Sequence, residues 1–183
     1  MLVSYIPSAR SQAATCLLVT DSTRTNLTKE LIMFNDSIKM KGRLNIVLTG
    51  PDGELKEQLE VDNLVVTVGK NFIASSMAKT TTNSPAAMTH MEVGTSTQAA
   101  AVGDTALITP VSGSRVALTS TTVTNNNVAY VATFPAGTGT GALTEAGIFN
   151  ASSSGTLLCR TVFSVINKGA ADTLGITWTV TVN

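Results

Sequence analysis

The chain contains one histidine, His90, and acid–base or nucleophilic catalysis would most readily use this residue. Met88 and Met91 lie close to it in the sequence, and no G-x-S-x-G nucleophile elbow occurs. Serines and aspartates are numerous enough for a Ser–His–Asp triad, but nothing in their spacing indicates one. The sequence therefore gives His90 no catalytic partner.

Acidic residues offer two further possibilities. Glu92 and Glu145 could form the carboxylate pair of a glycosidase if the fold brought them together. An acidic run could attract Ca²⁺, and it consists of Asp52, Glu54, Glu57, Glu60 and Asp62. The alternating placement of this run is more typical of the exposed side of a strand. We therefore predict no catalytic residue, no metal site and no enzymatic activity.

Two features resemble cofactor sites only superficially. Segment 137–141 has three glycines, as a phosphate-binding loop does, but it lacks the Lys-Ser/Thr ending and is followed by an expected strand where a helix would be required. Cys16 and Cys159 are too few for a disulfide framework and too far apart in sequence for a metal-ligand spacing. We predict no cofactor and two small apolar thiols in a chain that folds in a reducing cytosol.

The charge composition argues against nucleic acid and membrane as partners. Twelve Lys and Arg balance twelve Asp and Glu, so no net charge attracts the protein to phosphates or anionic lipid. Basic residues are scattered, aromatic residues are scarce, and no run reaches the about 18 apolar residues of a membrane span. The 29 threonines, with only eight charged residues in 73–183, instead favour strands with a neutral surface that associates with itself.

Periodicity predicts the elements of the first half. Residues 1–39 show no clear period and are expected to form an N-terminal arm or extension before a single domain over 40–183. Alternating apolar residues around the turn at 50–53 predict a hairpin over 43–61, followed by a strand over 64–68. Phe72, Ile73 and Met77 fall at helical spacing and predict one short helix over about 70–79.

The second half predicts further strands. We expect a short strand over 90–93, a loop over 98–109, a hairpin over 115–134 that turns at 125–127, and three strands within 143–182. Short strands with antiparallel connections predict an all-β, mainly antiparallel domain of β-sandwich or jelly-roll-like type. Trp178 lies on the apolar side of its strand, which favours core packing over a sugar-binding platform. The expected core anchors are Phe149, Phe163 and Trp178.

Glu145 and Arg160 are predicted to form a structural pair. They lie on two strands that the expected hairpin places side by side, and each has strongly apolar neighbours. An isolated charge in such surroundings is costly and should be paired. We therefore expect a Glu145–Arg160 ion pair that fixes the register of the two strands.

Two segments resemble signatures of small virion structural proteins of tailed bacteriophages. Residues 94–97, Gly-Thr-Ser-Thr, and 103–107, Gly-Asp-Thr-Ala-Leu, are similar to the pattern VGTGT…GDTAL. Residues 143–149, Leu-Thr-Glu-Ala-Gly-Ile-Phe, resemble the EAGIF or EIGLF element of phage fibre and tail proteins. The resemblance covers roughly Met40 to Asn183 and leaves residues 1–39 outside it.

The resemblance implies a β-domain that acts as an oligomer, commonly a trimer, on the phage particle, and it brings no catalytic residues. We expect a capsid decoration or head-associated protein of the virion, assembled in the host bacterial cytoplasm, that contacts its own copies and other virion proteins. The alternative is a tail fibre or tail-associated module that binds a host receptor or a surface glycan.

Overall fold

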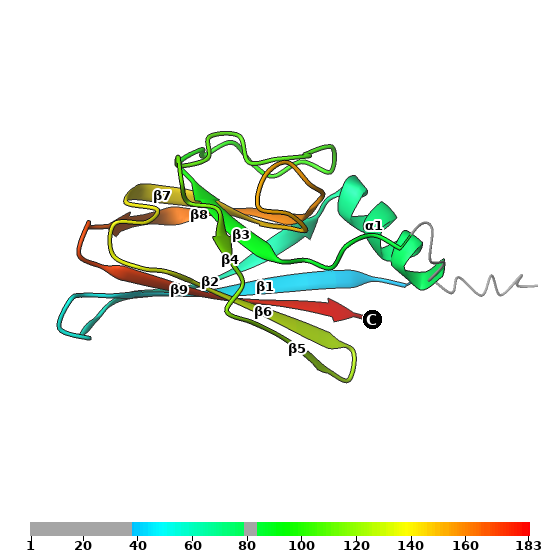
Figure 1. The fold of residues 1–183 in the computed structure, drawn as a ribbon, viewed down its shortest axis with the longest axis horizontal. Coiled ribbons are helices and arrows are strands. Elements are labelled where there is room, and N and C mark those ends of the chain that lie inside the picture. The colour runs from blue at the N-terminus through cyan, green and yellow to red at the C-terminus, as the bar shows by residue number, and fades with distance from the viewer. Residues whose placement is uncertain (1–37, 79–83) are drawn as a thin grey trace, which may run out of the picture. The chain divides into compact units, whose positions relative to one another are not determined.

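A computed structural model describes residues 38–78 and 84–183 of the chain. The arm expected over 1–39 lies outside the described residues, apart from its last two positions. Within the described ranges the chain forms nine strands and one helix (Figure 1): β1 Met40–Thr49, β2 Leu55–Val65, α1 Thr67–Ala78, β3 His90–Gly94, β4 Val116–Ala117, β5 Ser120–Thr124, β6 Asn127–Phe134, β7 Gly141–Phe149, β8 Leu157–Lys168 and β9 Thr173–Val182.

The strands form one curled sheet in which neighbours run antiparallel, in the order β4-β3-β7-β8-β2-β1-β9-β6-β5. Strand β2 joins the two halves, because it pairs with β1 along most of its length but with β8 only through Leu64 and Val65. The prediction of a mainly antiparallel β protein with one helix is thereby confirmed.

The hairpin predicted over 115–134 is observed as β5 and β6, but its first arm does not reach back to residue 115, because the chain forms two strands over 116–124 that belong to opposite ends of the sheet. β4 pairs with β3, whereas β5 pairs with β6. Between them, the Leu118 N–H donates to the carbonyl of Thr89 and the Thr119 N–H donates to the carbonyl of Val131. This two-residue crossing therefore connects one half of the curled sheet to the other.

The hairpin predicted over 43–61 is observed as β1 and β2, with Gly53 in its turn at a φ of 81°. The separate strand predicted over 64–68 is wrong, because β2 continues without a break to Val65. Asn63 pairs with Gly42 of β1, and its side chain occupies the space where a Cβ atom at position 42 would lie. Helix α1 then begins at Thr67, three residues before the predicted start.

The main core lies on the inner side of the curl. Trp178 on β9 is fully buried, and its cross-strand neighbours are Leu44 on β1 and Tyr130 on β6. Phe163 belongs to the same apolar cluster, whereas Phe149 belongs to a second, smaller cluster that includes Leu107. All three expected aromatic anchors are buried. Large aromatic side chains contribute much of the apolar area that stabilises a core.

Helix α1 approaches the backbone of β8 closely through Gly69, which is its one buried residue. A Cβ atom at this position would clash with the Leu158 carbonyl group. We expect Gly69→Ala to lower the free energy of unfolding by about 1–3 kcal/mol in urea denaturation, because overpacking against a rigid backbone forces the helix outward. Gly103→Ala is the matched control, since a Cβ atom there meets nothing within 4 Å. Equal stability of the two variants would show that the helix is free to shift.

Candidate functional site

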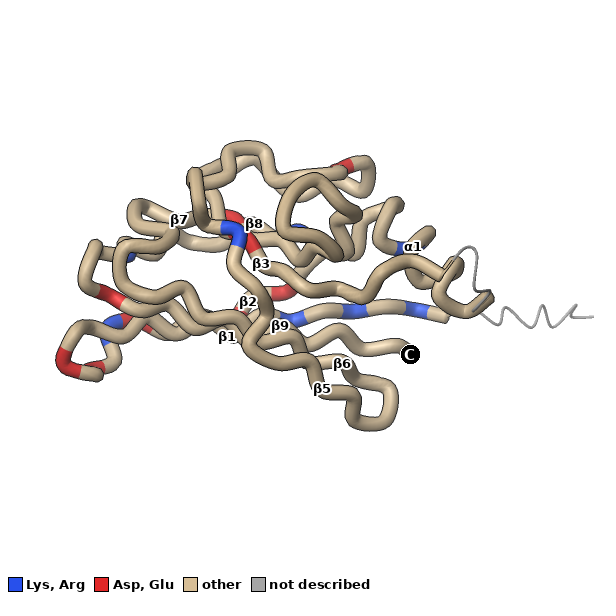
Figure 2. Tube along the Cα trace, in the orientation of Figure 1, with Lys and Arg blue, Asp and Glu red and all other residues tan. Residues whose placement is uncertain are grey.

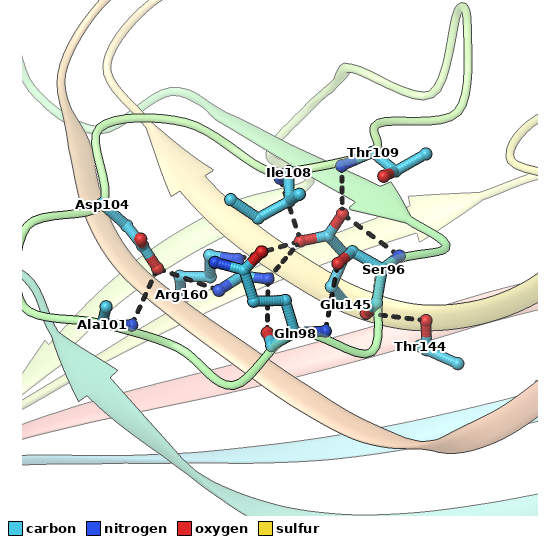
Figure 3. A network of polar contacts seen from close by, with 9 residues as sticks. All are labelled: Ser96, Gln98, Ala101, Asp104, Ile108, Thr109, Thr144, Glu145 and Arg160. Atoms are coloured by element: carbon cyan, nitrogen blue, oxygen red, sulfur yellow. Dashed lines mark hydrogen bonds and ion pairs between the residues drawn. The ribbon is translucent and has the colours of Figure 1, made fainter.

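Arg160 on β8 and Glu145 on β7 form a fully buried ion pair beneath the loop that connects β3 to β4 (Figure 3). Nε and Nη2 of Arg160 lie 2.9 and 2.8 Å from Oε2 of Glu145. The structure therefore brings together the two residues that the sequence pairs. They are diagonal neighbours, because Glu145 lies opposite Val162 and Arg160 lies opposite Gly147.

The loop itself supplies the other acceptors of the guanidinium. Nη1 of Arg160 donates to the Asp104 carboxylate at 2.9 Å, and Nη2 donates to the backbone carbonyl of Gln98 at 2.9 Å. Asp104 also accepts the backbone N–H of Ala101. No sequence pattern indicates Asp104 or Gln98 as a partner of Arg160. Asp104 lies in the segment that resembles GDTAL, which was the one signal that singled it out.

Glu145 binds the same loop from the sheet side. Its carboxylate oxygens accept the backbone N–H groups of Thr109 at 2.7 Å, Ile108 at 3.2 Å and Ser96 at 3.4 Å. Gly94 allows this approach, because a Cβ atom there would lie 2.5 Å from both Oε1 of Glu145 and the Thr109 carbonyl oxygen. The two carboxylates and one guanidinium leave one excess negative charge, which the backbone N–H groups help to stabilise.

The arrangement can hold a loop, but it leaves Glu145 poorly placed for proton transfer. A general acid or base must reach the substrate within hydrogen-bond distance, whereas the Glu145 side chain is 0% exposed and both of its oxygens are already bonded. Glu92 is engaged separately, by Arg115 at 2.8 Å, and the Arg115 guanidinium stacks on the Phe149 ring. The two glutamates considered as a catalytic pair are thus each bound to a different arginine.

The other candidate residues are also placed. His90 lies on β3, where Nδ1 is 2.8 Å from the Thr89 hydroxyl group. Cys159 is buried, and burial raises the pKa of its thiol to about 12, which keeps the thiol protonated. Cys16 lies outside the described residues. Within ranges 38–78 and 84–183, no group of three or more His, Cys, Asp or Glu could hold a metal ion. In the acidic run, Glu60 instead pairs with Arg43.

A second charged cluster, which no sequence pattern predicts, lies at the turn between β8 and β9. Asp172 is buried and accepts a hydrogen bond from Lys56 of β2 at 2.8 Å. Lys56, together with the Gly169 N–H, lowers the pKa of the Asp172 carboxyl group. The Lys168 Nζ donates to the carbonyls of Pro135 and Asp172, and burial lowers the pKa of this lysine. The cluster fastens the glycine-rich segment before β7 to this turn.

The part of the chain that the structure describes contains no helix that is long and apolar enough to cross a membrane. Comparisons with protein-family models, with curated proteins and with solved structures gave no match.

We expect Arg160→Met to lower the free energy of unfolding by about 3–5 kcal/mol, because it leaves the carboxylates of Glu145 and Asp104 buried without their counter-charge. Arg43→Met is the matched control, since its ion pair with Glu60 is exposed and should contribute at most about 1 kcal/mol. Urea denaturation of both variants measures the difference. The network does not hold the loop if both variants lose the same small amount.

The lowered pKa of Asp172 makes its contribution to stability dependent on pH. A carboxyl group whose pKa is lower in the folded state stabilises the fold above its unfolded pKa of about 3.9, and this contribution disappears as the pH falls through the folded value. We expect the stability difference between the wild type and Asp172→Asn to be constant at pH 6–7 and to shrink on acidification. Thermal unfolding at a series of pH values measures it, and a difference independent of pH would contradict the assignment.

Proposed function

We propose that the protein is a non-enzymatic structural component of a tailed-phage virion, and that it acts as a capsid decoration or head-associated protein through contacts between its own copies. The observation that carries this proposal is the network around Arg160. Glu145 belongs to the segment that resembles EAGIF, and Asp104 belongs to the segment that resembles GDTAL. One guanidinium binds both. The segments that carry the resemblance therefore serve to hold the scaffold together.

The outer side of the sheet supports a role in docking. On β9, Thr177, Thr179 and Thr181 alternate with the buried residues Trp178 and Val180. The adjoining hairpin β5–β6 carries no charged residue, as Figure 2 shows. A neutral, hydroxyl-lined sheet of this kind offers a broad surface to a flat partner without electrostatic repulsion. We further propose that the two halves of the curled sheet work as a sandwich-like unit and that the copies form a trimer.

A specific surface feature favours the second candidate, a tail fibre or tail-associated module that binds a host glycan. A hollow of about 460 Å³ lies over the outer side of β2, β1 and β9. Its lining offers donors and acceptors suited to sugar hydroxyl groups: Lys41, Arg43, Asn45, Glu60, Asp62, Thr177, Thr179 and Thr181. Binding of a host surface glycan in this hollow would be a receptor function.

Locating the protein in purified particles tests the two candidates. We expect mass spectrometry to find the chain in the virions of the phage that encodes it and immunogold labelling to mark the head. Labelling at the tail, with binding on a glycan array that Arg43→Ala and Asp62→Ala abolish, would favour the receptor module. Thr122→Ala, outside the hollow, is the control for the array. Absence of the chain from intact particles would contradict both candidates.

A further inference from the structure

In the described part of the chain, strand β5 is the last strand at one edge of the sheet. Its five residues are all exposed, and among the described residues β5 pairs only with β6. Alternate backbone N–H and C=O groups of an edge strand point away from the sheet and can accept another strand. The strand at the other end of the order, β4, has only two residues and offers little to pair with.

This edge lacks the features that usually prevent strands from pairing between molecules. Native edges are commonly protected by charged side chains, proline or a bulge. β5 has the sequence Ser-Thr-Thr-Val-Thr, pairs with β6 without a register shift, and lies in a stretch free of charge from Arg115 to Glu145. By contrast, the part of β2 that extends beyond its pairing with β8 carries four charges, at Lys56, Glu57, Glu60 and Asp62.

An apolar row of the main core also ends uncovered at this edge. Val180 on β9 is buried, Val128 on β6 is its partly buried cross-strand neighbour, and Val123 on β5 follows with 69% of its surface exposed. Burying an exposed valine is worth roughly 1.5 kcal/mol or more. A further strand beside β5 would continue this row and bury Val123.

We propose that β5 pairs with β5 of a second copy of this chain, antiparallel and across a two-fold axis at Thr122. In this register Thr122 lies opposite Thr122 of the copy, and Thr121 lies opposite Val123 of the copy. Pairs of β-branched side chains are favourable across antiparallel strands, and no like charges meet. A two-fold contact uses the β5 edge of both copies and is closed, whereas a contact between β5 and an unlike edge of a copy leaves the second β5 edge open. The inference rests on the proposed role in contacts between copies.

The size of the contact predicts weak association in dilute solution. Five paired residues bury much less than the about 800 Å² per partner of a standard stable interface. Many copies held side by side on a particle would raise the effective concentration and complete the pairing. The contact is compatible with a trimer, because each subunit would present its own β5 edge to a copy in a neighbouring trimer.

Cysteine cross-linking of the purified full-length chain tests the pairing independently of the virion. In a Cys16→Ser background, oxidation of Thr122→Cys should yield about tenfold more disulfide-linked dimer than Thr177→Cys, because paired thiols have a high effective concentration. Thr177 is exposed on the same side of the sheet but lies on the interior strand β9. Equal cross-linking of the two variants overturns the proposal.

A charge exchange provides the second measurement. Thr122→Lys should weaken self-association about tenfold in sedimentation equilibrium, because two lysines would face each other across the axis, whereas Thr177→Lys should leave it unchanged. Mixing Thr122→Lys with Thr122→Glu should restore the dimer. The pairing with a second copy is overturned if this mixture fails to associate. It is also overturned if Thr122→Cys in particles cross-links only to a different protein. Loss of virion association alone, with cross-linking intact, would instead contradict the proposed function.

Discussion

The buried guanidinium of Arg160 sets the position of a large part of the structure. A charge removed from water is costly unless its donors find acceptors. The acceptors come from two places: Glu145 on β7, and Asp104 with the Gln98 carbonyl in the β3–β4 loop. If the loop moved away from the sheet, the buried charges of Arg160 and Glu145 would lose their partners. Its position in turn places Leu107 over Phe149 and completes the second apolar cluster. One residue on β8 therefore fixes a loop without regular secondary structure.

The strands with one buried side were predictable from the sequence. In β9 the period of two separates Trp178 and its apolar neighbours from the threonines, and in β1 it separates Leu44 and Ile46 from the polar residues. Strand β7 was predictable as a strand, but not its surroundings, because nearly every residue in it is buried. Strand β7 is covered by the loop between β3 and β4, which has no sequence period. No local pattern links Asp104 of this loop to Arg160, 56 positions away. The pair Glu145–Arg160 was predictable only because both residues are charges in apolar strands.

The error over residues 115–134 has a different cause. Strand propensity and the alternation of apolar and polar residues are local properties of a segment. Both β4 and β5 have the local properties of a strand. The partners differ, because Ala117 pairs with His90 while Ser120 pairs with Val131. This choice depends on how the sheet curls, which is a tertiary property. Asp172 was missed for a similar reason, since its partner Lys56 lies 116 positions away on strand β2.

The use of charge connects the interior of the protein with its surface. Of the eight charged residues in 73–183, Lys79 lies outside the described residues, and the other seven are Glu92, Asp104, Arg115, Glu145, Arg160, Lys168 and Asp172. Each of these seven has a polar partner within the fold. In this half of the chain, the charged side chains therefore join loops to strands, and few charges remain on the surface. Strand β5 carries no charged residue, so two β5 edges can approach one another with little electrostatic cost.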